Sequence, residues 1–459
     1  MSTARRIAAT VLRRVGEDDA FAAAALSAEL DRAGGLDPRD RALATELVYG
    51  VLRTEGYLLE VLGRFGKIRR ADTELTSHLL VGAYQIAFLD RVPQRAAVHE
   101  AVAEIKRARG ARVAGFANAV LRKVTTAELE PLTVALRRSA PEWLVERLVR
   151  AVGEEETSAL LGDGAGAGLG LRLSAGAAAP AWLSDPDLVQ PSELAPGAYR
   201  FRGGGDPRRL PGYGAGAFVV QEEGAQLVTW AVGARPGERV LDACAGRGQK
   251  ASLLGELVGP TGELWATDLH AGKLEQLRLE FERLGLPRPR TLAVDWTRGS
   301  SPGAPGLGAP GSEGAEVPSG SNGPEDVMGS SSPGAGLPGR FDRVVVDVPC
   351  VGDGTLRRRP EIARRLRPED PARLTGVQRA ILRAAASQAR SGGRVTYATC
   401  SVLREACEEV LEGVSDLLEP APFDAPQVAG VFPPDQSSLR LLPRTHGTDG
   451  YFVASLRRR

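Results

Sequence analysis

Two cysteines of this sequence stand where thiol chemistry could take place. Cys350 follows an apolar run that ends at Asp347, and Cys400 follows another that ends at Thr399. Each run is typical of a buried strand, and ligands of open α/β sheets bind beyond the carboxyl ends of the strands. A few per cent of a thiol with a pKa of roughly 8.5 is thiolate at neutral pH, and the thiolate is a strong nucleophile. Two thiols at neighbouring strand ends therefore predict a site for covalent catalysis.

Each cysteine taken alone also has a structural interpretation, because free cysteine is among the residue types most often buried. The pairing of Cys350 with Cys400 at neighbouring strand ends is what favours a reactive site. Cys407 lies in a predicted helix after Cys400 and is interpreted as structural. None of the 4 cysteines has the CxxC spacing of a metal site, and 4 in 459 residues are too few for a disulfide scaffold. No metal is predicted.

A glycine-containing loop follows an earlier predicted strand that ends at Asp242. Gly246 and Gly248 allow the backbone to approach a ligand closely, and the helix that follows presents free N–H groups. The next strand ends at Asp268, where a carboxylate can accept hydrogen bonds from ribose hydroxyls. The pattern predicts a nucleotide-like cofactor. Gly246-x-Gly248-x-x-Ala251 also fits a dinucleotide loop, so a nicotinamide-dependent oxidoreductase is an alternative, although that class has no need for the two thiols.

Alternating strands and helices must position these loops. Apolar runs predict strands at Arg239–Asp242, Leu264–Asp268, Leu292–Asp295, Arg343–Asp347 and Arg394–Thr399. Helical spacing is found at Gln249–Val258, Gly272–Leu284, Thr375–Arg390 and Arg404–Leu418. This alternation predicts a Rossmann-like α/β domain with a doubly wound, mostly parallel sheet, and Tyr451–Ser455 as a late edge strand.

The rest of the chain divides into regions of different pattern. Residues 1–130 repeat apolar side chains at helical spacing and are predicted to form an all-α bundle. Residues 131–215 are less regular and are interpreted as a small α+β adaptor, and residues 216–459 contain the α/β domain. Residues 299–339 consist largely of Gly, Ser, Pro and Ala, which predicts a disordered insertion.

Bulk composition narrows the class of protein. No apolar run is long enough to span a bilayer and no signal-peptide core is present, so we expect a cytoplasmic monomer without a membrane partner. The formal net charge of +1 does not by itself indicate a nucleic-acid partner. Arginines nevertheless cluster locally, and Arg357, Arg358 and Arg359 follow the Cys350 motif directly. They could bind RNA phosphates or form an ordinary solvated surface.

Together the motifs resemble those of the bacterial RNA cytosine-5 methyltransferases of the RsmB (Sun/Fmu) type, which act on 16S ribosomal RNA. The likeness rests on Asp242-Ala-Cys-Ala…Gly-x-Lys250, Asp347-x-Pro-Cys350-x-Gly-x-Gly-Thr-x-Arg-Arg-x-Pro360 and Thr399-Cys-Ser-Val402. The first 130 residues are similar to the NusB-like RNA-binding domain of that type, and the likeness spans nearly the whole chain except 299–339. Arg247 and Val351 depart from the family pattern, which usually has Ala-Pro-Gly-Gly and Pro-Cys-Ser-Gly there.

The resemblance implies S-adenosylmethionine as methyl donor and carbon 5 of a cytosine in small-subunit ribosomal RNA as acceptor. Cys400 would attack carbon 6, Cys350 would assist its release, Asp347 would hydrogen-bond the base and Lys250 would orient these groups. The expected cofactor-binding residues are Cys244, Ala245, Gly246, Arg247, Gly248, Gln249 and Lys250, with Asp268 at the ribose, Asp295 at the adenine, and Asp347. Sequence chemistry alone does not decide which thiol is the nucleophile. Another ribosomal site, a transfer RNA substrate, or a non-catalytic RNA-binding adaptor are the alternatives.

Overall fold

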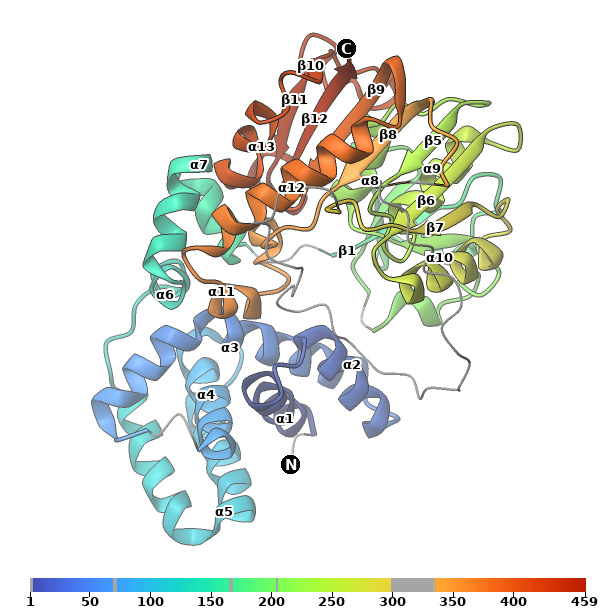
Figure 1. Ribbon diagram of the computed structural model, residues 1–459. Coiled ribbons are helices and arrows are strands. Elements are labelled where there is room, and N and C mark those ends of the chain that lie inside the picture. The colour runs from blue at the N-terminus through green and yellow to red at the C-terminus, as the bar shows by residue number, and fades with distance from the viewer. Residues whose placement is uncertain (1–2, 69–71, 165–167, 204, 299–333, 335) are drawn as a thin grey trace, which may run out of the picture. The chain divides into compact units, whose positions relative to one another are not determined.

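The computed structural model describes residues 3–68, 72–164, 168–203, 205–298, 334 and 336–459. Contacts divide the chain into two compact units (Figure 1). Within the described residues, the first unit holds the chain up to 164 together with 355–366, and the second holds the remainder. The insertion predicted at 299–339 falls almost entirely outside the described residues. No described helix is long and apolar enough to cross a membrane.

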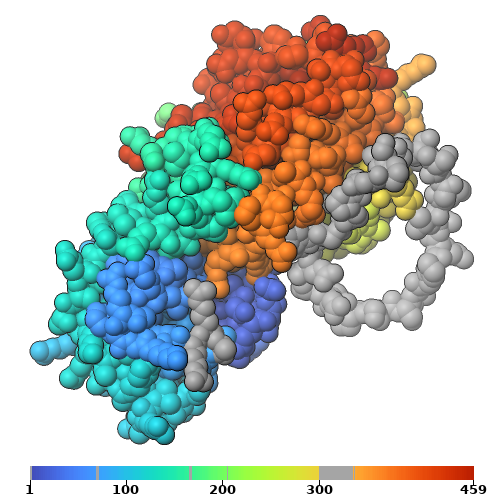
Figure 2. Space-filling view, turned by 60° about the vertical axis from the view of Figure 1, so that its left-hand side comes forward, coloured from blue at the N-terminus to red at the C-terminus, as the bar shows by residue number. Residues whose placement is uncertain are grey.

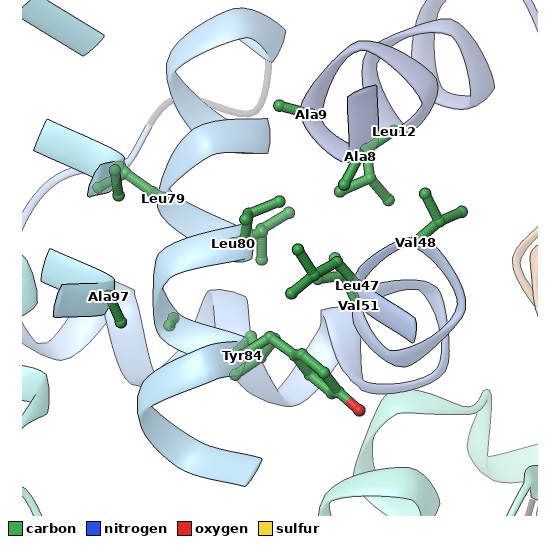
Figure 3. Packing of buried hydrophobic residues seen from close by; sticks show 14 of the residues in the cluster. Ala8, Ala9, Leu12, Leu47, Val48, Val51, Leu79, Leu80, Tyr84 and Ala97 are labelled. Atoms are coloured by element: carbon green, nitrogen blue, oxygen red, sulfur yellow. The ribbon is translucent and has the colours of Figure 1, made fainter. Parts of the chain in front are cut away.

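Helices form the first unit, as predicted for an all-α bundle. They are α1 (Thr3–Glu17), α2 (Ala22–Ala33), α3 (Pro38–Phe65), α4 (Thr73–Phe88), α5 (Gln94–Val124), α6 (Leu132–Ser139) and α7 (Glu142–Leu161). Figure 3 shows Leu80 and Tyr84 of α4 pointing toward Leu47 of α3, with Leu12 of α1 beside them. Burying an aliphatic side chain of this size stabilises a fold by about 1.5–3 kcal/mol, so this shared apolar core accounts for the bundle.

A segment from far along the chain completes the first unit. It contains the short helix α11 (Glu361–Arg365). The buried Glu361 accepts the backbone N–H of Ala22 at the start of α2, with an N···O distance of 3.3 Å. Arg365 donates to the carbonyl oxygens of Asp19 and Ala20 at 2.8 and 2.9 Å. These contacts fix residues 355–366 to the helical bundle.

The second unit is built on a mixed sheet with the order β10-β12-β9-β8-β5-β6-β7, and β11 pairs with β12. The strands are β5 (Arg239–Asp242), β6 (Glu263–Asp268), β7 (Arg290–Ala293), β8 (Phe341–Asp347), β9 (Ala389–Thr399), β10 (Leu418–Pro420), β11 (Ser438–Leu441) and β12 (Tyr451–Arg458). Strands β5 to β9 pair in parallel, as predicted. The prediction of β12 as an edge strand is wrong, because β12 pairs with β9, β10 and β11 and is buried from Tyr451 to Leu456.

Helices cover both faces of this sheet (Figure 1). Helices α8 (Glu223–Ala231), α9 (Gln249–Val258) and α10 (Ala271–Arg283) pack on one face, where Val240 and Val345 point. Helices α12 (Asp370–Ala386) and α13 (Glu408–Glu412) pack on the other, against Leu241, Val344 and Val346. The alternation of neighbouring residues between the two clusters is the period of a strand buried on both faces. Orange and red residues, from the C-terminal part of the chain, form much of the second unit's surface on one side (Figure 2).

Helix bounds in this unit depart from the prediction for two helices. Helix α12 begins at Asp370, before the expected Thr375, because Pro371 in its first turn favours helix initiation. It ends at Ala386, before the expected Arg390, because strand β9 already begins at Ala389. The expected helix over residues 404–418 is reduced to a 3-10 turn and α13, which ends before Gly413. Cys407 has φ −110° and ψ −99°, which lies outside the helical region and breaks this helix.

A small antiparallel sheet precedes the large one. Its order is β2-β3-β1-β4, with β1 (Leu169–Leu173), β2 (Val189–Pro191), β3 (Ala198–Phe201) and β4 (Phe218–Val220). Arg172 of β1 is buried and donates to Glu256 and Ser252 of α9 at 2.5 and 3.1 Å. These bonds tie the small sheet to the helix that follows the glycine loop. The strands agree with an α+β adaptor, and its limits at residues 131 and 215 stay predictions.

Candidate active site

The carboxyl ends of the parallel strands bring the sequence-predicted residues to one edge. Asp242 of β5 stands opposite Val345 of β8, and Asp347 of β8 stands opposite Ala398 of β9. Asp268 ends β6, the other neighbour of β5. Parallel strands end on the same side, so the loops after β5, β6, β8 and β9 meet there.

The two thiols lie side by side at this edge. The Sγ atoms of Cys350 and Cys400 are 3.0 Å apart, and both side chains are half-buried. Their turns follow the adjacent strands β8 and β9, as the sequence predicted. A thiol and a thiolate at this separation can share a proton, so the pair can act together in proton transfer.

The turn that carries Cys350 is held from two sides. Gln378 of α12, which is fully buried, donates to the carbonyl oxygen of Pro349 at 2.9 Å. The backbone N–H of Gly354 donates to the carbonyl oxygen of Cys400 at 3.0 Å. A Cβ at Gly354 would lie 2.1 Å from the carbonyl oxygen of Gly450, so only glycine allows the two turns to approach this closely.

Lys250 lies in the first turn of α9, and its Nζ donates to Asp347 Oδ2 at 2.7 Å. It also lies 6.0 Å from the centre of the Tyr451 ring. Burial on its own would lower the pKa of Lys250, but the charge and hydrogen bond of Asp347 outweigh it and raise the pKa. Lys250 therefore stays protonated beside Asp347.

Hydrogen bonding to Cys350 and then burial raise the pKa of Cys400 well above its usual value. The positive charge of Lys250 opposes this shift only in part. In the free protein Cys400 is accordingly a thiol at neutral pH, and the thiolate must form when the site is occupied. Burial likewise raises the pKa of Cys407, which is fully buried with its Sγ 3.5 Å from the carbonyl oxygen of Ser401. This burial agrees with its structural interpretation.

The glycine loop between β5 and α9 has the geometry expected of a cofactor loop. Gly248 has φ +89° and caps α9, and a Cβ there would lie 2.7 Å from Cγ of Leu277. The backbone N–H of Gly246 donates to Asp268 Oδ2 at 3.1 Å, and that of His270 donates to Oδ1 at 2.9 Å. Asp268 is thus fixed beside the loop before any ligand binds.

Asp242 is a further group that the sequence analysis did not select. Its carboxyl group is buried, and its Oδ1 has no hydrogen-bond partner among the described residues. Burial and the charge of Asp347 raise the pKa of Asp242 to about 7. A buried acceptor left open at this loop fits a positively charged or hydrogen-bonding cofactor group. Its place as the last strand residue before the glycine loop is the sequence feature that could have identified it as a cofactor-binding residue.

Other predicted cofactor residues are distributed along the same edge. Asp295 lies two residues beyond the end of β7, and its Oδ1 accepts the N–H and the hydroxyl of Thr297 at 3.0 and 2.6 Å. Arg247 is exposed in the loop, whereas Gln249 directs its amide toward the carbonyl oxygen of Val220 at 3.3 Å. Burial raises the pKa of Cys244, which keeps it a neutral thiol. Ala245 is buried, so it can offer mainly backbone groups.

The three arginines after the Cys350 motif belong to the first unit. Arg357 is 8% exposed, Arg358 is half-buried and Arg359 is exposed. The carbonyl oxygen of Arg357 accepts a bond from Arg53 of α3 at 3.2 Å. Phosphate binding by this cluster stays a prediction, and exposure favours Arg359 over Arg357.

Comparison with known proteins agrees with this geometry. Residues 2–126 match the NusB family, and residues 230–302 and 325–457 match the family described as 16S rRNA methyltransferase RsmB/F. A Synechocystis protein named "Probable ribosomal RNA small subunit methyltransferase B" is 30% identical, with 100% of both chains covered. The chain belongs to the RsmB/F methyltransferase family.

Members of the RsmB/F family are RNA methyltransferases, and S-adenosylmethionine is their methyl donor. The Vibrio cholerae ribosomal RNA small subunit methyltransferase B is 30% identical to this chain and covers 91% of it, with 90% of that protein matched. A crystal structure of PH0851 superposes with a TM-score of 0.75 at 22% identity, covering 99% of this chain and 98% of the other. That structure establishes the likeness of the fold.

Proposed function

We propose that this RsmB/F-family protein methylates carbon 5 of a cytosine in 16S ribosomal RNA through a covalent bond between Cys400 and carbon 6. The observation that carries the proposal is the 3.0 Å separation of the Cys350 and Cys400 sulfurs beside the Lys250–Asp347 pair. Two thiols at one site suit a reaction in which one sulfur bonds to the substrate and must then be released. The names of the relatives support ribosomal RNA of the small subunit as the substrate.

In the first step the Cys400 sulfur bonds to carbon 6 of the cytosine. The thiol proton leaves Cys400 and passes through the Asp347 carboxylate to N3 of the ring, so charge does not accumulate. Lys250, hydrogen-bonded to Asp347 at 2.7 Å, keeps that carboxyl group oriented toward the base. The product has an S–C6 bond, an N3–H bond and an electron-rich carbon 5.

S-adenosylmethionine supplies an electrophilic methyl group, which carbon 5 accepts. Asp268, the N–H groups of the Gly246–Gln249 loop and the open oxygen of Asp242 would hold this cofactor. Leu269 is 39% exposed next to Asp268 and offers an apolar surface to the adenine. Asp295 would contact the edge of the adenine.

Release reverses the addition. Cys350, once its own proton has passed to solvent, takes the proton from carbon 5, the C5–C6 double bond re-forms, and the Cys400 sulfur leaves as a thiolate. The N3 proton then passes back through Asp347 to Cys400, and the proton taken from carbon 5 stays on Cys350, 3.0 Å away. One proton is released for each methyl group transferred. The target base must be out of its stack to reach these groups. The exposed guanidinium group of Arg359 offers a cation for an RNA phosphate.

Two alanine variants test this mechanism. We expect Cys350→Ala to accumulate a protein–RNA adduct that survives denaturing electrophoresis, and Cys400→Ala to form none, with 16S ribosomal RNA and S-adenosylmethionine supplied. Cys407→Ala, which removes a buried thiol away from the pair, should methylate as the wild type does. Adduct in Cys400→Ala alone would exchange the roles of the two cysteines.

Nucleoside mass spectrometry of the RNA gives the second readout. The wild type should form 5-methylcytidine, and the modified fragment identifies the position. Methylation of transfer RNA but not of 16S ribosomal RNA would change the substrate while leaving the chemistry. No methylated RNA of either kind would contradict the proposal.

A further inference from the structure

Asp353 lies three residues after Cys350 and belongs to neither the thiol pair nor the cofactor loop. Its side chain is completely buried. A carboxyl group in such a position is costly unless its oxygens are used, because burial penalises the charged form. The contacts of the Asp353 oxygens therefore indicate the role of this residue.

Those contacts converge on the turn that presents Cys400. Asp353 Oδ2 accepts the backbone N–H of Val402 at 2.8 Å. A hydrogen bond from the hydroxyl of Ser401, which is also fully buried, reaches the same carboxyl group. Burial raises the pKa of Asp353 to about 6, and these two bonds limit the shift, so the group is ionised at neutral pH. The two residues that follow Cys400 are thus both held by one carboxylate.

The neighbouring residue holds Cys400 from its other side. The N–H of Gly354 donates to the carbonyl oxygen of Cys400 at 3.0 Å, and the carbonyl oxygen of Gly354 accepts from Gly450 at 2.7 Å. With its own carbonyl group and the next two residues fixed, Cys400 has little freedom in the direction of its Cα–Cβ bond. That direction sets the distance from its sulfur to Cys350.

We propose that Asp353 is a positioning residue for the Cys400 thiol, which it holds at the separation from Cys350 that the reaction needs. The inference rests on the proposed function of the two thiols. A displacement of the order of 1 Å in a reacting group can cost about 10²-fold in rate. The charge of the nearby Glu405 also raises the pKa of Asp353.

Three variants test the inference. Asp353→Ala removes both acceptor bonds, whereas Asp353→Asn keeps an oxygen for the N–H of Val402. Asp370→Ala is the matched control, because Asp370 is also buried and accepts a backbone N–H, that of Arg367 at 2.9 Å, but does not touch the Cys400 turn. Thermal denaturation of each variant establishes that it is folded before it is assayed.

The first readout is single-turnover methylation of 16S ribosomal RNA at saturating cofactor. We expect Asp353→Ala to lower the rate constant about 10²-fold while the RNA concentration for half-maximal rate changes less than about threefold. Asp353→Asn should recover most of the rate, and Asp370→Ala should keep it. A wild-type rate in a folded Asp353→Ala protein would overturn the inference.

The second readout does not depend on methyl transfer. Diamide oxidises two neighbouring thiols to a disulfide, and its N=N bond takes up the two electrons and two protons. The 3.0 Å pair should form a Cys350–Cys400 disulfide, detected by peptide mass spectrometry, at least about fivefold faster in the wild type and in Asp353→Asn than in Asp353→Ala. Equal rates in all of them, or no such disulfide in the wild type, would contradict the positioning role. This result stands whether or not the wild type methylates RNA.

Discussion

The amino-terminal and the carboxyl-terminal ends of the parallel strands form two edges of the large sheet. Charged side chains are held differently at these two edges. At the amino-terminal edge, Arg343 of β8 is 3% exposed, donates to Glu238 at 2.6 Å and to Asp424 at 3.2 Å, and also donates to the carbonyl oxygen of Val232 at 2.7 Å. Asp424 in turn accepts from Arg235 at 2.8 Å. Buried charges at this edge are paired on several sides, which is the arrangement that stability requires.

At the carboxyl-terminal edge, a buried carboxyl oxygen lacks a hydrogen-bond partner. Asp242 Oδ1 has no hydrogen-bond partner among the described residues, and the two thiols lie in contact. A buried acceptor without a partner destabilises a fold, so ligand binding explains Asp242 better than stability does. One edge of the sheet thus contributes to stability, and the other holds the groups proposed to react. Variants at the two edges should therefore separate the two properties.

The largest effect is expected at the carboxyl-terminal edge. Lys250→Met keeps the length of the side chain but removes the charge that orients Asp347, so the rate constant for methylation should fall about 10³-fold, equivalent to about 4 kcal/mol in the barrier. Lys273→Met is the matched change, since Lys273 Nζ lies 3.6 Å from Asp268 and away from the thiols. It should raise the cofactor concentration for half-maximal rate and leave the rate constant within about twofold. A normal rate constant in Lys250→Met would contradict the assignment of the reacting groups to the carboxyl-terminal edge.

At the amino-terminal edge we expect a loss of stability without a loss of activity. Arg343→Met leaves Glu238 and Asp424 without their buried partner and should lower the free energy of unfolding by about 3 kcal/mol in urea denaturation. Methylation at 25 °C by the folded variant should be unchanged. The control is Arg390→Met at the same edge, where an exposed ion pair with Asp342 contributes less than about 1 kcal/mol. Loss of activity in a stable Arg343→Met protein would show that the edges are not separable.

The smallest effect depends on pH. The pKa of Asp242 in the folded protein is about 7, above the ordinary value of 3.8, so the folded protein binds more protons than the unfolded chain between these values. Stability from this group therefore falls as the pH rises from about 4 to about 7 and is constant above. Asp242→Asn removes the dependence, so its free energy of unfolding relative to the wild type should increase by about 2.6 kcal/mol between pH 5 and pH 8. A difference that stays constant with pH would contradict this, and weaker cofactor binding by the variant should accompany it.

Local sequence patterns predicted the parts of the fold that local interactions determine. Apolar runs predict β5, β6, β8 and β9, and the rule for the ends of parallel strands predicts that Cys350 and Cys400 lie together. Helix α9 begins and ends where its spacing and glycine loop indicate. The all-α character of the first unit followed from helical periodicity.

Long-range contacts were not predictable in the same way. The place of β12 inside the sheet depends on pairing with β10 and β11. The sequences of these two strands are too short and irregular to predict that pairing. Asp353 lies in a turn with no pattern of its own, and only the folded chain shows that it holds Val402, 49 residues away. No glycine or proline marks the break at Cys407 in the sequence.

The connection between the two units has a practical consequence. The chain leaves the Cys350 turn at Gly354, runs through residues 355–366 as part of the helical unit, and returns to the sheet at Arg367. Leu356 and Ala363, which are buried there, would lose their apolar neighbours if the N-terminal 165 residues were removed. The catalytic half is therefore not a module that proteolysis or gene truncation can separate cleanly. A fragment starting after residue 165 should aggregate unless this strip is shielded or supplied with the missing helices.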